Sequence, residues 1–237
     1  MTIARECDKI NAKAFIMEVA SQLHYARKHG NKYDTILFKI VIEVLMRVIA
    51  GSAKRKSLVC PSGKDTRPTT DRIKETLFNM LQPEISSDTR FLDLFSGSGG
   101  IGIEALSRGA KRCIFVERGR EALRCIRKNL ENTGFSEKAQ VLSMDVMQAL
   151  KYLSGREEPF DIIFLDPPYE AGFEDAVIPF LMSSALVSPN TLVILETSSG
   201  GMKKVETADY YQYLERCKNY KTNCHLFFRK TMGSDGM

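Results

Sequence analysis

Four consecutive residues, Asp166-Pro167-Pro168-Tyr169, combine the groups needed to hold a planar amine. A carboxylate and a backbone carbonyl can accept the N–H bonds of the amine, while the aromatic ring stacks on the base that carries it. The proline after Asp166 removes a backbone donor and fixes φ, so the turn is stiff and its carbonyls stay free for a ligand. The alternative is an ordinary turn, because Asp-Pro is a common turn former. These four residues are the candidate catalytic residues.

A glycine-rich loop provides a second candidate site. Gly97, Gly99 and Gly102 follow the pattern G-x-G-x-x-G between an apolar run and a helical pattern, which is the context that this motif needs. Glycine permits positive φ and lets a ligand lie against the backbone at a helix amino terminus. A tight turn without a ligand is the structural alternative. The residues of this region that we expect to bind a cofactor are Asp93, Phe95, Ser96, Gly97, Ser98, Gly99 and Gly102.

Acidic residues at the ends of expected strands bear on which cofactor binds. Glu117 lies twenty residues after Gly97 and can bind the two hydroxyls of a ribose, which NAD and S-adenosylmethionine both contain. Asp93 could face the cationic amino-acid end of S-adenosylmethionine, where a dinucleotide would place an anionic pyrophosphate. Asp145 could accept from the adenine amino group or, equally well, cap the following helix. With the tetrapeptide, these acids favour methyl transfer, and the expected cofactor contacts on this side are Glu117, Arg118, Asp145 and Val146.

The elements that must position these residues alternate regularly from about residue 90. Such alternation implies right-handed crossovers and a parallel sheet with helices on both faces. The carboxyl ends of such strands form the edge where open α/β sheets bind ligands. Two aromatic runs near the carboxyl terminus predict an antiparallel hairpin that finishes the sheet. The expected strands are 91–95, 112–117, 140–145, 161–165 and 191–196, the helices 101–108, 121–132, 146–153 and 174–183, and the hairpin strands 211–220 and 223–229.

Composition excludes several classes of protein. Hydrophobic content of 43% and charged content of 27% are ordinary for a globular chain of 237 residues. The longest apolar stretch, 36–45, contains Lys39 and Glu43 and is too short to cross a bilayer, and the amino terminus lacks the features of a signal peptide. The six cysteines form no C-x-x-C pair and the three histidines show no zinc spacing. We expect a cytoplasmic protein with reduced cysteines, no metal and no membrane partner.

Positive charge is concentrated ahead of the alternating region. Residues 46–75 contain eight Lys or Arg against three acids, an excess equal to the net charge of +5 of the whole chain. A basic patch outside the catalytic core suggests phosphate contacts that position a nucleic acid without reading its sequence. The alternative is a solvated face that keeps the protein soluble. Residues 46–51 and 58–61 look like two short strands, and a helix over 72–81 is expected, capped by Thr70 or Asp71 and ended by Pro83.

Two further motifs lie in this basic region: Met46-Arg47-Val48-Ile49-Ala50-Gly51, and Thr66-Arg67-Pro68-Thr69-Thr70-Asp71-Arg72 followed by Lys74-Glu75-Thr76-Leu77-Phe78-Asn79. With the loop over 93–102 and the tetrapeptide at 166–169, they make residues 46–230 resemble the bacterial 16S rRNA (guanine-N2)-methyltransferases of the RsmD type. The two amino-terminal motifs are far more specific than the glycine loop, which many methyltransferases share.

The resemblance implies a Rossmann-like class I methyltransferase fold with a seven-stranded, mostly parallel sheet, and S-adenosylmethionine as the methyl donor. The implied target is the exocyclic N2 of a guanine in 16S rRNA, guanine 966 in the family. The implied partner is the 30S subunit or an intermediate of its assembly, and we expect a monomer. The residues that we expect to contact RNA are Arg47, Lys54, Arg55, Lys56, Arg67, Thr69 and Arg72.

The chain then divides into three parts: an amino-terminal extension at 1–45, a small basic RNA-contacting segment at 46–83, and a methyltransferase domain at 84–232. Residues 11–29 have helical spacing, whereas 36–45 fit a strand or a helix. The extension has no counterpart in the family; either it is genuine or Met46 is the true first residue, and we favour the second hypothesis. The stretch 54–57 also lacks the glycine expected there, which leaves its RNA contact open.

Three other functions are compatible with parts of the sequence. A methyltransferase acting on adenine or cytosine amines in DNA uses similar tetrapeptides but usually carries a separate recognition region, and only 46–80 is available here. A non-catalytic ribosome-assembly factor would not need Asp93, Glu117 and Asp166, and an NAD oxidoreductase has no use for the tetrapeptide. We therefore expect Asp166 and the Pro167 carbonyl to accept both hydrogens of an unpaired or flipped guanine amine, while Tyr169 stacks on the base.

Overall fold

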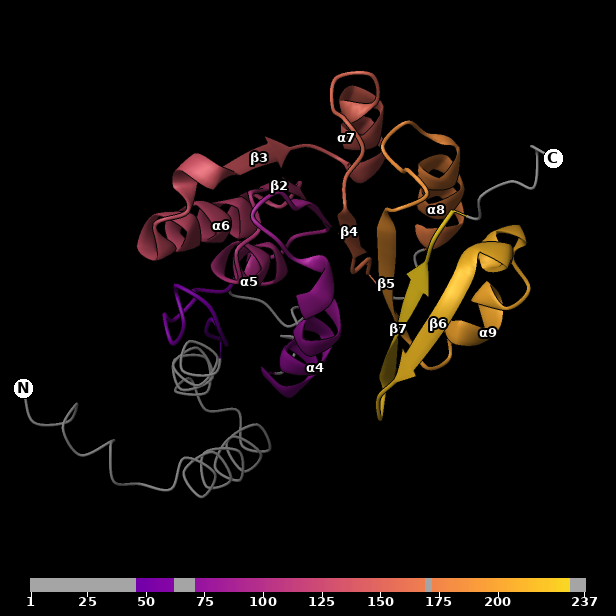
Figure 1. Cartoon of the computed structure of the whole chain (residues 1–237), viewed down its shortest axis with the longest axis horizontal. Helices are drawn as coiled ribbons and strands as arrows, with labels where there is room; N and C mark the ends of the chain where they lie inside the picture. Colours follow the sequence, from indigo (N-terminus) through magenta and orange to yellow (C-terminus); the bar gives the residue numbers. More distant parts are fainter. Residues whose placement is uncertain (1–45, 62–70, 169–171, 231–237) are drawn as a thin grey trace, which may run out of the picture.

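The computed structural model describes residues 46–61, 71–168 and 172–230. In these ranges seven strands form one sheet in the order β3-β2-β1-β4-β5-β7-β6 (Figure 1). The four neighbouring pairs among β1 to β5 are parallel, whereas β7 lies antiparallel between β5 and β6. The strands are β1 (Arg90–Leu94), β2 (Arg112–Glu117), β3 (Ala139–Ser143), β4 (Ile162–Leu165), β5 (Leu192–Ser198), β6 (Leu214–Asn219) and β7 (Asn223–Phe228).

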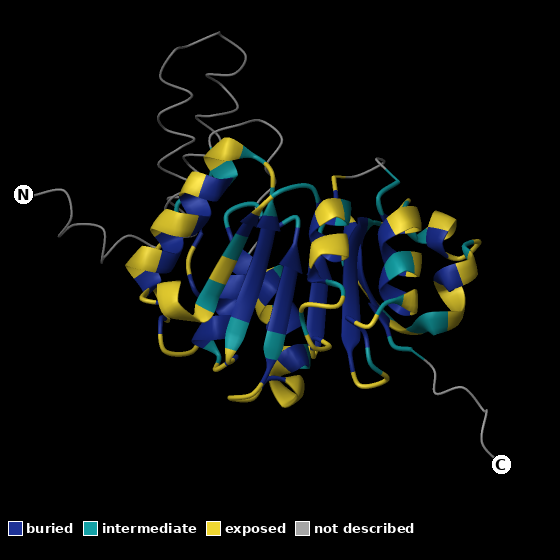
Figure 2. Cartoon of the chain, turned by 90° about the horizontal axis from the view of Figure 1, so that it is seen from above, coloured by how far each residue is buried: buried dark blue, intermediate teal, exposed yellow. Residues whose placement is uncertain are grey.

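Helices pack on both faces of this sheet because the side chains of each strand alternate between two apolar cores. Phe91, Phe115 and Phe164 belong to one core with residues of α4, α5 and α6. Leu92 and Val116 belong to the other with residues of α7 and α8. Figure 2 shows the central strands buried between these layers. The helices are α4 (Asp71–Leu81), α5 (Gly100–Ser107), α6 (Arg120–Thr133), α7 (Val146–Leu153), α8 (Glu174–Ser183) and α9 (Met202–Val205), with 3-10 turns at Gln82–Glu84, Ser136–Lys138 and Asp209–Tyr213.

The strands and helices expected between residues 91 and 196 are all present, with ends displaced by at most two residues. The expected start of the hairpin at 211 is wrong, because Asp209–Tyr213 forms a 3-10 turn. Tyr210 is buried there and its hydroxyl donates to Asp175 at 2.9 Å, which holds the turn against α8. The class I fold and its antiparallel carboxyl-terminal hairpin are confirmed. None of the helices that the structure describes is both long and apolar enough to cross a bilayer.

The segment 46–61 does not form the two strands expected for it. A single antiparallel bridge joins Arg47 to Ser57, and the backbone is held instead by side chains of α5. Glu104, which is fully buried, accepts the backbone N–H groups of Ile49 at 2.7 Å and Ala50 at 3.0 Å. Gly51 passes so close to α5 that a Cβ atom would lie 1.8 Å from the Ser107 carbonyl oxygen. The segment is therefore anchored by a buried carboxylate and a close backbone approach.

Two cations complete the environment of Glu104. Arg108 donates from Nε to Oε1 at 2.8 Å, and the buried Lys74 ammonium lies 3.9 Å from Oε2. The same ammonium donates to the Arg47 carbonyl at 2.6 Å. Burial lowers the pKa of Lys74, and Glu104 opposes that change. This one carboxylate therefore joins the segment 46–61, α4 and α5.

Replacing Glu104 by alanine should destabilise the fold strongly. The Glu104→Ala change leaves two backbone N–H groups and two cations without their acceptor, and breaking a buried pair typically costs about 3–5 kcal/mol. Urea unfolding followed by circular dichroism measures the change, with Glu131→Ala on the exposed face of α6 as the matched control. A loss below about 1 kcal/mol, the usual size for an exposed pair, would contradict the anchoring role.

Candidate active site

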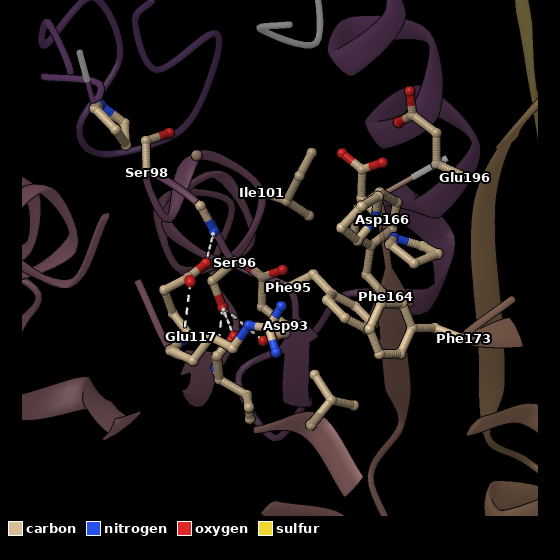
Figure 3. Close-up of a pocket in the computed structure, with 18 of the residues that line it drawn as sticks. Asp93, Phe95, Ser96, Ser98, Ile101, Glu117, Phe164, Asp166, Phe173 and Glu196 are labelled. Atoms are coloured by element: carbon tan, nitrogen blue, oxygen red, sulfur yellow. Dashed lines mark hydrogen bonds between the residues drawn. The ribbon is translucent and has the colours of Figure 1, made fainter. Parts of the chain in front are cut away.

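A cavity of about 590 Å³ opens at the carboxyl edge of the sheet (Figure 3). It lies where β1 and β4 meet, the point at which the strand order reverses, and ligands of open α/β sheets bind at such points. The glycine loop and the ends of β2 and β3 form one part of its wall. The end of β4, together with residues of β5 and β7, forms another. The candidate catalytic and cofactor-binding residues that the structure describes are thus brought to one cavity, apart from Gly99 and Gly102.

The loop after β1 is bent sharply at residues 95–99. Phe95 has φ of 61° and Gly97 has φ of 55°, so a non-glycine residue occupies the left-handed region immediately beside the cavity. Such backbone strain costs of order 1–3 kcal/mol and clusters at functional sites. Ser96 stabilises the bend, because its hydroxyl donates to the Asp93 carbonyl at 2.6 Å and accepts the N–H of Val116 at 3.0 Å. The loop is therefore fixed to β2 before any ligand binds.

Gly99 and Gly102 serve the packing of α5 rather than the cavity wall. Gly99, with φ of 79°, is the N-cap residue immediately before α5. A Cβ atom on Gly102 would lie 2.4 Å from the Phe115 ring, so only glycine lets α5 approach β2 this closely. Gly97 lines the cavity and these two do not, while ligand contact stays a prediction for all three.

Asp93 presents a buried carboxyl group to the cavity. Its side chain is 2% exposed, and Oδ2 accepts the N–H of Gly102 at 3.0 Å. Burial raises the pKa of Asp93 to about 7, and the negative charge of Glu117 adds to this effect, while the bond from Gly102 opposes it. A cation bound beside Asp93 would stabilise the ionised form, so this position suits a positively charged ligand.

Glu117 ends β2 with a carboxylate that three backbone groups hold in place. Oε2 accepts the N–H of Gly97 at 2.9 Å, and Oε1 accepts those of Arg118 at 2.8 Å and Gly119 at 2.7 Å. A carboxylate has about four acceptor positions, so these bonds leave capacity for a hydroxyl of a ligand. The carboxylate therefore orients the glycine loop and still lines the cavity.

Asp145 is the cap of α7, one of the two roles considered for it. Its Oδ1 accepts the N–H of Met147 at 2.9 Å, which satisfies a free donor in the first turn of the helix. Its Oδ2 lies 3.7 Å from the guanidinium of Arg118, whose side chain is largely exposed. Val146 is buried beside it, and all three residues line the cavity. Contact of Asp145 with an adenine amino group remains a prediction.

The end of β4 carries Asp166, Pro167 and Pro168 into the cavity wall, and Tyr169 lies outside the described residues. Asp166 is half-buried, Pro167 is buried and Pro168 is exposed. Burial raises the pKa of Asp166 well above its usual range, and the negative charges of Glu196 and Asp93 raise it further. In Figure 3 Asp166 and Glu196 lie toward one end of the cavity and Glu117 toward the other.

Sequence reasoning missed several residues of the cavity wall. Glu196 on β5 and Asn223 on β7 are buried beside the Asp166 end, and Phe173 packs its ring 5.2 Å from that of Phe95. Lys74 of α4 also lines the cavity. A signal for Glu196 was available, because it ends an expected apolar strand in the same way that Glu117 does. Nothing in the local sequence signals Asn223. No group of three or more His, Cys, Asp or Glu within the described ranges is placed to hold a metal ion.

The basic residues expected to contact RNA belong to a region that borders this cavity. Lys54, Arg55 and Arg72 are exposed. Arg47 forms an ion pair with Asp71 at 3.0 Å, and Lys56 donates to the Asn132 carbonyl at 2.8 Å. Met46, Pro61 and Ile73 of the same region line the cavity itself. Arg67 and Thr69 lie outside the described residues.

Comparison with known proteins identifies the family. The model of the family described as conserved hypothetical protein 95 matches residues 46–228. Ribosomal RNA small subunit methyltransferase D of Haemophilus influenzae is 38% identical over 153 residues, which cover 64% of this chain and 78% of that protein. The protein of the same name from Escherichia coli K12 is 36% identical over 152 residues, 64% of this chain and 74% of that protein. This chain belongs to the ribosomal RNA small subunit methyltransferase D family.

Solved structures agree with this membership. Escherichia coli yhhF matches with a TM-score of 0.65 at 32% identity, over 78% of this chain and 97% of that one. A hypothetical protein of Thermus thermophilus also matches with a TM-score of 0.65, at 30% identity over 77% of this chain and 98% of that one. The resemblance seen in the sequence is confirmed. The cavity fits the cofactor of such methyltransferases, S-adenosylmethionine, because Asp93 suits a cation and Glu117 a ribose.

Binding of S-adenosylmethionine should depend on pH through Asp93. Below a pKa of about 7 the carboxyl carries a proton that must leave before a cation can pair with it, so affinity should fall as pH decreases through 7, by at most about tenfold per unit. The Asp93→Asn change should weaken binding roughly 10- to 100-fold, the loss of a charged hydrogen bond, and remove this pH dependence. Calorimetric titration between pH 5.5 and pH 8 measures both effects.

A stability measurement controls for misfolding of this variant. The folded-state pKa of Asp93 lies above its usual value of 3.8, so ionisation of Asp93 lowers the free energy of unfolding as pH rises toward 7. The Asp93→Asn variant should therefore be at least as stable as the wild type at pH 8. Unchanged affinity in a stable variant would show that Asp93 does not face the cofactor.

Proposed function

We propose that this protein transfers a methyl group from S-adenosylmethionine to the exocyclic N2 of a guanine in 16S rRNA, with the guanine 966 of its family as the expected target. The observation that carries this proposal is the shared cavity, in which Asp166 and Pro167 lie together with Asp93, Glu117 and the glycine loop. The relatives named ribosomal RNA small subunit methyltransferase D support the choice of rRNA.

The cofactor would lie against the glycine loop, held by Asp93, Glu117 and Asp145. When bound, S-adenosylmethionine supplies an electrophilic methyl group and leaves as a neutral thioether. The residues at the end of β4 orient the nucleophile. The carboxylate of Asp166 and the carbonyl of Pro167 accept the two hydrogens of the amine, which turns its lone pair toward the cofactor. Tyr169 stacks on the base.

Asp166 also suits the removal of the proton that the amine loses after transfer. Burial and neighbouring negative charge raise its pKa, so the carboxylate is a stronger base than an exposed aspartate. A cation bound beside Asp93 favours the ionised form of the buried acids around it. Positioning supplies most of the rate enhancement in this scheme, and the base acts late.

The basic segment 46–83 would hold RNA phosphates at the mouth of the cavity, while residues 84–232 form the methyltransferase domain. The segment is joined to α5 through Glu104, so phosphates bound there are placed relative to the cofactor. The target guanine must leave its stack to enter the cavity. We propose that the enzyme acts as a monomer in the cytoplasm on the 30S subunit or an intermediate of its assembly.

Transfer of a tritiated methyl group tests the proposed function. The acceptors are 30S particles and free 16S rRNA from a strain of the native host that lacks the gene, followed by mapping of the labelled nucleotide. The wild type should label one guanine at N2. Asp166→Ala should reduce the rate roughly a hundredfold or more, the size expected when the reacting atoms are misplaced, and should still bind cofactor. Asp88→Asn, exposed at the opposite edge of the sheet, is the matched control.

Three results would contradict this function. Label on DNA alone would show a different nucleic acid substrate, and label at an adenine or cytosine amine would show a different base. An Asp166→Ala variant that methylates at nearly the wild-type rate would show that the carboxylate does not have the role proposed for it.

The RNA-contacting role of the basic segment has a separate test. Replacing Lys54 and Arg72 by alanine should weaken RNA binding without changing which nucleotide is labelled, because phosphate contacts carry no sequence information. The slope of log affinity against log salt should become shallower by about one to two, roughly one for each phosphate that is no longer neutralised. Filter binding between about 50 and 200 mM salt measures this slope. Lys151→Ala with Lys218→Ala, exposed elsewhere, should leave it unchanged.

A further inference from the structure

Glu196 and Asn223 form a buried polar pair on the cavity wall next to Asp166. Glu196 is 4% exposed on β5 and Asn223 is 5% exposed at the start of β7. Asn223 donates from Nδ2 to Glu196 Oε1 at 2.6 Å, and His225 Nε2 lies 3.0 Å from Oε2. The other ring nitrogen of His225 lies 3.1 Å from the Tyr220 hydroxyl. The carboxylate is therefore fixed from two sides.

The chemistry of this pair determines which way the Asn223 amide faces. Because the amide nitrogen donates to Glu196, the amide oxygen is directed away from that carboxylate. That oxygen, Oδ1, is buried and has no hydrogen-bond partner in the part of the chain that the structure describes. A buried acceptor left unpaired costs about 1–3 kcal/mol. Asn223 is a lining residue of the cavity, so this unpaired acceptor lies beside the space where a ligand could bring a donor.

Glu196 offers further acceptor capacity at the same place. One oxygen bonds to Asn223 and the other to His225, whereas a carboxylate has about four acceptor positions. Together with Asp166, the Glu196–Asn223 pair makes this end of the cavity rich in acceptors. A ligand edge that presents several adjacent N–H groups fits such a wall, and one that presents lone pairs is repelled by it.

The three amino-bearing nucleobases differ in this respect. In guanine the ring nitrogen N1, next to the exocyclic amine, carries a hydrogen and is a donor. In adenine and cytosine the ring nitrogen beside the amine on the pairing edge is an acceptor. Amine-binding groups of the kind found at Asp166 and Pro167 do not separate these bases, because all three amines donate two hydrogens. Discrimination requires an acceptor placed for the neighbouring ring nitrogen.

We propose that Glu196 and Asn223 are specificity-determining residues that accept the N1–H of the target guanine. This role rests on the proposed function, and it makes the Glu196–Asn223 pair responsible for the choice of base. His225 and Tyr220 are positioning residues, because they hold Glu196 in place and are not themselves part of the cavity wall. With adenine or cytosine in the site, the lone pair of the unprotonated ring nitrogen would face a lone pair of Glu196 or Asn223. The resulting repulsion excludes both bases.

The test compares guanine with 2-aminopurine at the mapped target position of reconstituted 30S particles. 2-Aminopurine keeps the exocyclic amine but has an unprotonated N1, so the wild type should methylate it roughly 10- to 100-fold more slowly than guanine. Glu196→Gln introduces an amide that can donate to an unprotonated N1, and Asn223→Leu removes an acceptor at similar volume. Each variant should lower the guanine to 2-aminopurine rate ratio at least about fivefold.

Glu215→Gln, which removes an exposed charge from β6, is the matched control and should keep the wild-type ratio. Because the measurement is a ratio, a general loss of activity does not imitate the effect, and calorimetric binding of S-adenosylmethionine verifies that each variant is folded. Equal rates on the two bases in the wild type, or an unchanged ratio in both variants, would overturn this inference. Absence of label on guanine in the wild type would instead overturn the proposed function.

Discussion

The arrangement around the cavity depends on the hydrogen bonds and ion pairs of one buried carboxylate, that of Glu104. It belongs to α5, the helix that follows the glycine loop, and has no access to solvent. Its two oxygens bind the backbone of residues 49 and 50, and Lys74 and Arg108 balance its charge. Because α5 also begins at the loop, the same helix positions the cofactor side of the cavity and the basic segment in front of it. The cavity wall and the basic segment therefore share one support.

A second constraint is the concentration of acids at the carboxyl edge of the sheet. Asp93, Glu117, Asp166 and Glu196 all line one cavity. Burial raises the pKa of Asp93 and Asp166, and the negative charges of their acidic neighbours raise both further. Such an arrangement reduces the stability of the protein, because buried charges of one sign are brought together. A ligand that is positively charged or rich in N–H donors relieves this repulsion. The cavity thus favours such ligands partly through the repulsion that their binding removes.

Much of the fold follows from local sequence patterns, whereas part of the site does not. Apolar runs and glycines located the strands and helices between 91 and 196 because each signal is local. Residues 46–51 have the same apolar character, yet their N–H groups bind Glu104 instead of a neighbouring strand, and no local pattern encodes that partner. Glu117 and Asp166 could be found because each ends a strand. Asn223 could not, because its place depends on the register between β5 and β7.

The insertion of β7 between β5 and β6 has a consequence for the order in which the protein becomes active. After β5 the chain leaves the sheet, forms α9 and β6, and only then returns to pair with β5. During synthesis the glycine loop, Asp93 and Asp166 are all present before residue 223 exists. Until β7 is in place, Glu196 faces an open sheet edge and lacks both of its partners. The glycine-loop side of the cavity is therefore assembled from early segments, whereas the Glu196–Asn223 pair, proposed to select the base, is completed last. A partly made chain lacks that pair.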